Sequence, residues 1–115
     1  GRMNHPKILG MPESSIFVAG DTIDNLVASN HLTPGLIKID TEGAEFRVLS
    51  GAKEVIKEFR PIILSELCEK LLNAQGSSCQ EVYGLLNEFN YQILDAYTLK
   101  TVTGPIDGEI IAIPV

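Results

Sequence analysis

Asp40 is the first of several acids in this chain that stand where a carboxylate can do chemistry. It directly follows the apolar run 36–39 (LIKI), and Pro34 and Gly35 mark a turn before that run. A run of this kind predicts a short strand buried on both faces, as in a parallel sheet. Ligands bind open α/β sheets in the crevice outside the carboxyl ends of the strands. Asp40 is therefore a candidate site residue, although an acid after a strand can also serve only to cap the next helix.

Glu66 stands near the end of a second apolar run, 62–67 (IILSEL). If the two runs form neighbouring parallel strands, the backbones of Asp40 and Glu66 lie about 5 Å apart. Two carboxylates so close repel each other, and a divalent cation with oxygen ligands would relieve the repulsion. Such carboxylates can take a proton directly or hold a metal that acidifies a hydroxyl. Lys38 is able to pair with one of these acids, and the sequence does not decide which.

Glu42 and Glu45 follow Asp40 closely. Glu42 lies at the N-terminus of the helix expected next, where its negative charge is close to the positive end of the helix dipole. It is thus either a partner of that dipole or a site residue. We interpret Glu45 as a solvated or structural acid.

The composition limits the class of protein. With 115 residues, 44% of them hydrophobic, the chain predicts one soluble globular domain. A net charge of -6 argues against a broad contact with nucleic acid phosphates. No apolar run approaches the ~20 residues of a membrane span.

Cys68 and Cys79 indicate neither a zinc site nor a disulfide framework, so we expect a reduced, cytoplasmic setting. No base is identifiable near Cys68, and His5 and His31 are predicted to be surface residues.

Alternating strands and helices position these acids. Residues 1–14 lack periodicity and predict a tail or loop. Apolar spacing predicts one long helix over 44–59, in which Gly51 allows close approach to the sheet. The expected order is strand 15–19, helix 21–30 capped by Asp21, strand 36–39, helix 44–59, strand 62–67, helix 78–89 capped by Ser78 and stopped by Asn90, strand 91–94 and strand 109–113. This alternation predicts an α/β fold with a mainly parallel sheet, in which the last two strands pair antiparallel.

Four motifs in this order form a recognisable set: TIDNL at 22–26, LIKIDTEGAE at 36–45, VLSGA at 48–52, and RPIIL at 60–64 with Glu66. Over about residues 18–96 the sequence resembles the FkbM-type family of S-adenosylmethionine-dependent methyltransferases. Members of that family carry a T-L-D-D-L-like element, a K-I-D-x-E-G-x-E block, a leucine with a G-A pair, and a strand that ends in glutamate. The block from Lys38 to Glu45 is the most specific part of the resemblance. Asn25 stands where the family commonly has an aspartate.

The resemblance implies a Rossmann-like methyltransferase fold and transfer of a methyl group to a hydroxyl of a small molecule or sugar. It implies catalytic roles for Asp40, Glu42 and Glu66, and contact with the S-adenosylmethionine cofactor for Asp40. The glycine-rich turn of the family's first strand and the acid that holds the cofactor ribose do not occur in this sequence. We therefore expect residues 15–115 to form the carboxyl-terminal half of such a domain. By itself that half is expected to bind the cofactor weakly.

A second interpretation is a non-catalytic α/β binding or interaction module. Loss of the leading strands would uncover a sheet edge beside residues 15–19 or 36–40, and uncovered edges pair with other chains. We therefore expect a homo-oligomer formed through an exposed sheet edge, with no nucleic acid or membrane as partner. The acceptor and the use of a divalent metal stay open.

Overall fold

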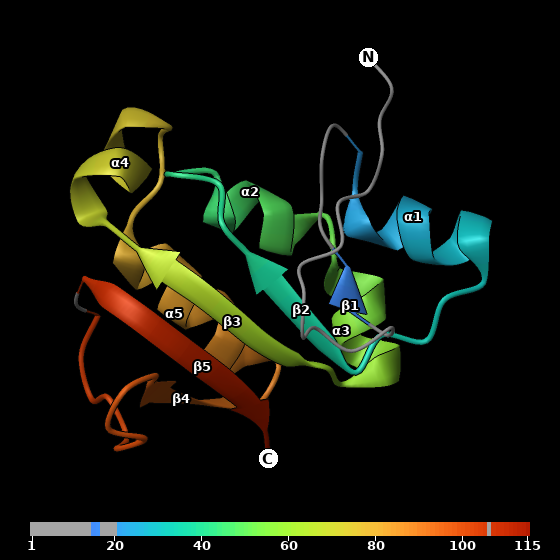
Figure 1. Ribbon diagram of the computed structural model, residues 1–115. Coiled ribbons are helices and arrows are strands. Elements are labelled where there is room, and N and C mark those ends of the chain that lie inside the picture. The colour runs from blue at the N-terminus through green and yellow to red at the C-terminus, as the bar shows by residue number, and fades with distance from the viewer. Residues whose placement is uncertain (1–14, 17–20, 106) are drawn as a thin grey trace.

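The computed structural model describes residues 15–16, 21–105 and 107–115. The expected tail 1–14 and residues 17–19 of the first expected strand lie outside these ranges. In chain order the elements are β1 (Ser15–Ile16), α1 (Ile23–Asn30), β2 (Leu36–Ile39), α2 (Glu45–Ser50), α3 (Lys53–Phe59), β3 (Ile62–Leu67), α4 (Glu69–Ala74), α5 (Cys79–Glu88), β4 (Tyr91–Asp95) and β5 (Gly108–Pro114) (Figure 1).

The five strands form one sheet in the order β1-β2-β3-β5-β4. The pairs β1–β2 and β2–β3 are parallel, whereas β5 is antiparallel to both of its neighbours, β3 and β4. The expected antiparallel pairing of the last two strands is thus confirmed. This mixed α/β sheet is compatible with a Rossmann-like fold.

One face of the sheet is packed against helices. Alternate residues of the strands point into this packed layer, and α2, α3 and α5 lie behind the sheet in Figure 1. The buried strand residues are Ile37, Ile39, Ile63, Ser65, Leu67, Tyr91, Ile93, Ile110 and Ala112. The intervening residues are exposed or half-buried: in β3, Ile62 and Glu66 are exposed and Leu64 is half-buried. Because period-two alternation decides which side chain faces which side, Glu66 of β3 lies on the face opposite these helices.

The long helix predicted over 44–59 is wrong, because the structure divides it into α2 and α3 at Gly51 and Ala52. The cause lies in α1. The Asp24 carboxylate accepts hydrogen bonds from the backbone N–H groups of Glu54 at 3.2 Å and Val55 at 2.9 Å. The Asp24 backbone N–H in turn donates to the Gly51 carbonyl at 3.0 Å. Asp24 therefore caps a new helix start, which the apolar periodicity alone does not reveal.

Gly51 makes its close approach to α1 rather than to the sheet, so that part of the prediction is also wrong. A Cβ at this position would lie 3.1 Å from Cγ2 of Thr22. The N-cap of α1 is Thr22, whose hydroxyl accepts from the Asn25 backbone N–H, and not Asp21 as expected. Asp21 instead accepts the Thr22 backbone N–H at 2.7 Å.

The short helix α4 has no counterpart among the predicted elements. Its N-cap, Cys68, makes no side-chain capping hydrogen bond. The capping acceptor is Asp107, whose Oδ1 lies 2.8 Å from the Glu69 backbone nitrogen. Among the described residues, no helix is long and apolar enough to cross a membrane.

Candidate functional site

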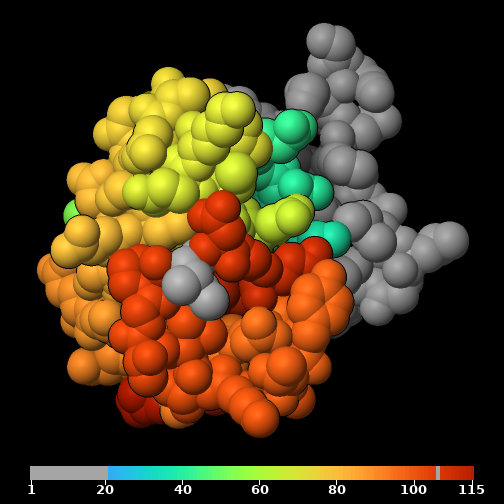
Figure 2. All heavy atoms as spheres, turned by 90° about the vertical axis from the view of Figure 1, so that its left-hand side faces the viewer, coloured from blue at the N-terminus to red at the C-terminus, as the bar shows by residue number. Residues whose placement is uncertain are grey.

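A cavity of about 220 Å³ opens at the carboxyl end of the parallel strands. It is lined by Lys38, Ile39, Asp40, Leu64, Ser65, Glu66, Ala96, Glu109 and Ile110. Figure 2 looks onto this end of the sheet: the teal residues around the end of β2, the yellow-green end of β3 and the red start of β5 lie near the orange segment after β4. The cavity therefore lies at the carboxyl ends of the strands, where the sequence analysis predicted a ligand-binding crevice.

The strand register brings Asp40 and Glu66 together, as predicted. Ile39 of β2 pairs with Ser65 of β3, so the next residues on the two strands are Asp40 and Glu66. Both side chains are exposed, and both residues line the cavity.

The sequence reasoning missed a third acid, Glu109. It is the antiparallel partner of Glu66 and lines the same cavity. Because β5 runs opposite to β3, its amino-terminal start meets the carboxyl end of β3. In the sequence, Glu109 is an acid at the first position of the final apolar run. That position places it beside Glu66 only if β5 lies next to β3, which the sequence does not show.

The three carboxylates lie across adjacent strands with little compensating charge. Like charges directly opposite each other on paired strands are destabilising, and Glu66 faces Glu109 in this way. Among the described residues that line the cavity, Lys38 is the one that is basic. Lys38 forms no salt bridge with Asp40 or Glu66, since in the described ranges the single salt bridge joins Lys57 and Glu54. Such a local violation of pairing rules is characteristic of functional sites.

Tyr97 lies beside these acids. A hydrogen bond to Glu109 and the negative charges of Glu109, Glu66 and Asp95 raise the pKa of its phenol. The Asp95 carboxylate accepts the backbone N–H groups of Tyr97 at 2.8 Å and Thr98 at 2.9 Å, and these bonds lower the pKa of Asp95. The turn after β4 is thereby fixed next to the cavity, with a hydroxyl that is a donor at neutral pH.

The turn that follows Asp40 places Glu42 differently from the expectation, whereas Glu45 takes the structural one of its two expected alternatives. Glu42 precedes the N-cap Ala44 and has a φ of 52°, so it is not in the first turn of α2. The acid in that turn is Glu45, and at 1% exposure it is buried rather than solvated. Gly43, with φ 116°, approaches α4 so closely that a Cβ would lie 2.5 Å from the Leu71 carbonyl oxygen. Only glycine fits this position.

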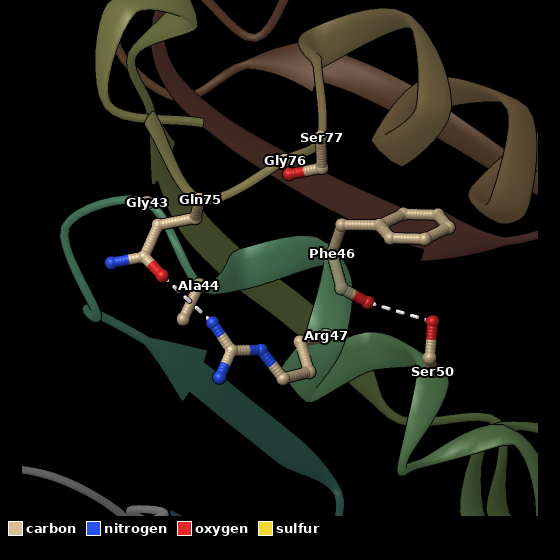
Figure 3. A pocket seen from close by; sticks show the side chains of 8 residues that line it. All are labelled: Gly43, Ala44, Phe46, Arg47, Ser50, Gln75, Gly76 and Ser77. Atoms are coloured by element: carbon tan, nitrogen blue, oxygen red, sulfur yellow. Dashed lines mark hydrogen bonds between the residues drawn. The ribbon is translucent and has the colours of Figure 1, made fainter. Parts of the chain in front are cut away.

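Two further cavities border the same turn. One of about 470 Å³ includes Thr41, Ala44 and Arg47. The other, of about 240 Å³, lies between α2 and the residues after α4. Figure 3 shows Arg47 and Gln75 pointing toward each other across it, joined by a hydrogen bond of 2.8 Å. Neither of these cavities includes Asp40, Glu66 or Glu109, so we place the candidate site at the first cavity.

The cysteines and His31 lie away from this cavity. Burial, helped by the nearby Glu69 and Asp107, raises the pKa of the Cys79 thiol to about 12. Cys68 is half-buried at the start of α4. His31 is an exposed left-handed C-cap of α1, in agreement with its predicted surface position. Within the described residues, no group of three or more histidine, cysteine or acidic side chains is arranged to hold a metal ion.

Comparison with known proteins gives one match. The sequence model of the methyltransferase FkbM domain matches residues 3–93. No curated protein and no solved structure matches the chain. The matched range includes Asp40, Glu42 and Glu66, and it ends before Tyr97 and Glu109.

Proposed function

The chain belongs to the methyltransferase FkbM domain family, and on that basis we propose that it supplies the acceptor side of an S-adenosylmethionine-dependent O-methyltransferase. Family membership indicates a methyltransferase; the acceptor and the cofactor are our proposal. The observation that carries it is the row of Asp40, Glu66 and Glu109 along one cavity. A hydroxyl is the acceptor that such a row suits, because carboxylates accept hydrogen bonds and protons from it.

The proposed contact with the cofactor is made at Asp40, and the cavity does not enclose the whole cofactor. At about 220 Å³ it is smaller than the ~300–1,000 Å³ of sites that enclose a whole ligand. The exposed Asp40 carboxylate is a suitable acceptor for the hydroxyl or ammonium groups of S-adenosylmethionine. When bound, this cofactor supplies the methyl group.

Asp40 and Glu66 have distinct roles in this reaction. Asp40 accepts the proton that the acceptor hydroxyl loses on methylation, at one of its carboxylate oxygens. Glu66 accepts a hydrogen bond from the same or a neighbouring hydroxyl and so orients the acceptor. Glu42 is exposed in the turn between Asp40 and α2 and does not line the cavity, so it is given no contact with the acceptor.

Replacing Asp40 tests the proposal. In the full-length protein we expect Asp40→Asn to lower turnover at least ~100-fold, since a positioned acid or base contributes about 10²–10⁴. The assay follows transfer of the labelled methyl group of S-adenosylmethionine to the methyl glycosides of glucose, galactose and mannose and to glycerol. Asp24→Asn is the matched control, because it makes the same change at a helix cap that does not line the cavity. Near-normal turnover of a folded Asp40→Asn protein would remove Asp40 from the reaction.

A further inference from the structure

Glu45 is a buried carboxylate with a defined set of partners. Its side chain reaches back along the chain, where Oε1 accepts the Gly43 backbone N–H at 3.0 Å and Oε2 accepts the Thr41 backbone N–H at 3.3 Å. With 1% exposure it is far less accessible than Asp40 or Glu42. Burial of a charged group is costly unless hydrogen bonds satisfy it, so these two bonds account for its place in the core.

The identity of the residue follows from the two donors. Each carboxylate oxygen takes one N–H group, and both oxygens are acceptors only. A glutamine of the same shape would offer one acceptor and would set its NH₂ group against the other backbone N–H. Glutamate at position 45 therefore satisfies both backbone N–H groups, although an apolar or amide side chain would be less costly to bury.

The turn that Glu45 holds is strained. Glu42 adopts φ 52° between the two bonded amides, a left-handed conformation in which the Cβ of a non-glycine residue comes too close to the following carbonyl oxygen. Such a conformation persists only where its surroundings over-determine it. Here the Glu45 carboxylate fixes the turn from one side, and the close approach of Gly43 to the Leu71 carbonyl fixes it from the other.

We propose that Glu45 is a positioning residue, whose buried carboxylate holds the Thr41–Gly43 turn so that the Asp40 and Glu42 carboxylates keep their places at the end of β2. The assignment rests on the proposed methyl transfer for its consequence in catalysis. Glu45 itself does not line the candidate cavity, so it acts through the backbone of the turn.

The test compares three variants of the full-length protein. In Glu45→Gln we expect faster hydrogen exchange of the Thr41 and Gly43 amides by NMR. We also expect turnover at least ~10-fold lower with little change in KM for S-adenosylmethionine, because a small misplacement of a reacting group is enough for such a loss. Glu45→Asp, which keeps two acceptor oxygens, should restore part of both properties. Asp24→Asn also weakens carboxylate–amide bonds at a helix start, and it should leave the two amides protected and turnover unchanged.

The outcomes separate the two claims. Unchanged protection of both amides in Glu45→Gln would overturn the positioning role, and so would lost protection with normal turnover. An equal fall of turnover in Asp24→Asn would show that lost stability alone explains the effect. If wild type methylates none of the acceptors, the proposed function fails, whereas the exchange data still decide whether Glu45 holds the turn.

Discussion

Cys79 illustrates how a residue's surroundings determine its chemistry. It is 3% exposed, its thiol lies 3.8 Å from Asp107 Oδ1, and its backbone N–H donates to Glu69 at 2.7 Å. Burial and these two acids raise the pKa of the thiol from an ordinary 9.0 to about 12. The thiolate, which is the nucleophile, is therefore disfavoured in the folded protein.

We expect iodoacetamide at pH 8 to alkylate Cys68 and to spare Cys79 until the chain unfolds. The same shift has a consequence for stability. The unfolded chain releases the Cys79 proton near pH 9, before the folded chain does, so the free energy of unfolding falls as the pH rises from about 9 to about 12. Mass spectrometry of the alkylated peptides checks the first point, and urea titrations of wild type and Cys79→Ala at pH 8 and 10 check the second. Rapid labelling of Cys79 in the folded chain would contradict the assignment.

Among the elements, the start of α3 depends on one side chain of α1. The Asp24 carboxylate is the acceptor for two backbone N–H groups that α3 cannot satisfy within itself. Asp24→Ala should lower the free energy of unfolding by about 0.5–2 kcal/mol, the usual cost of losing a helix cap. Urea denaturation measures this, with Asp21→Ala as the control because the Asp21 bonds stay within the segment 21–25. Equal stability of wild type and Asp24→Ala would mean that α3 needs no cap from α1.

Helices and strands whose bounds depend on neighbouring residues could be predicted from the sequence. Bounds that depend on residues far along the chain could not. The runs 36–39 and 62–67 gave β2 and β3 with their bounds, and Ser78 gave the start of α5. The break at Gly51 and the start of α4 were missed, because their caps, Asp24 and Asp107, are 30 or more positions away.

The residues of the candidate site also include some that could be predicted from the sequence and some that could not. Asp40 and Glu66 were expected together because each follows or ends its own strand, and parallel strands align those ends. Glu109 lines the cavity, with Tyr97 hydrogen-bonded to it, only because β5 lies between β3 and β4, and the local periodicity of the sequence does not reveal the order of the strands. The burial of Glu45 was missed because it depends on how the turn folds back, with Glu42 in a left-handed conformation.

For the molecule as a whole, the outer side of β4 is covered by its own chain. The Val102 backbone N–H donates to the Ile93 carbonyl at 3.0 Å, and the Asp95 N–H donates to the Lys100 carbonyl at 2.9 Å. The segment 100–102 thus occupies an edge that would otherwise present unpaired groups to a second chain. Self-association through a sheet edge stays a prediction, and this arrangement points to the β1 side of the sheet for it.

Uncovering β4 should promote association. Val102→Pro removes the donor to Ile93, so we expect a larger mean mass in light scattering than for wild type. Thr103→Pro, one residue further along, is the control for the effect of proline itself. If the mass of Val102→Pro stays equal to that of the control, the segment 100–102 is not what protects this edge.

The bond between Asp24 and α3 also bears on the order in which the chain folds. Its two ends are 30 positions apart in the sequence, so it forms only after a long loop has closed. A helix as short as α3 is marginal in isolation, and its first turn has no cap of its own. We infer that α3 becomes persistent late, once α1 has docked, and that the contact acts mainly on the rate of unfolding. We therefore expect α1 and α3, joined through Asp24, to unfold together.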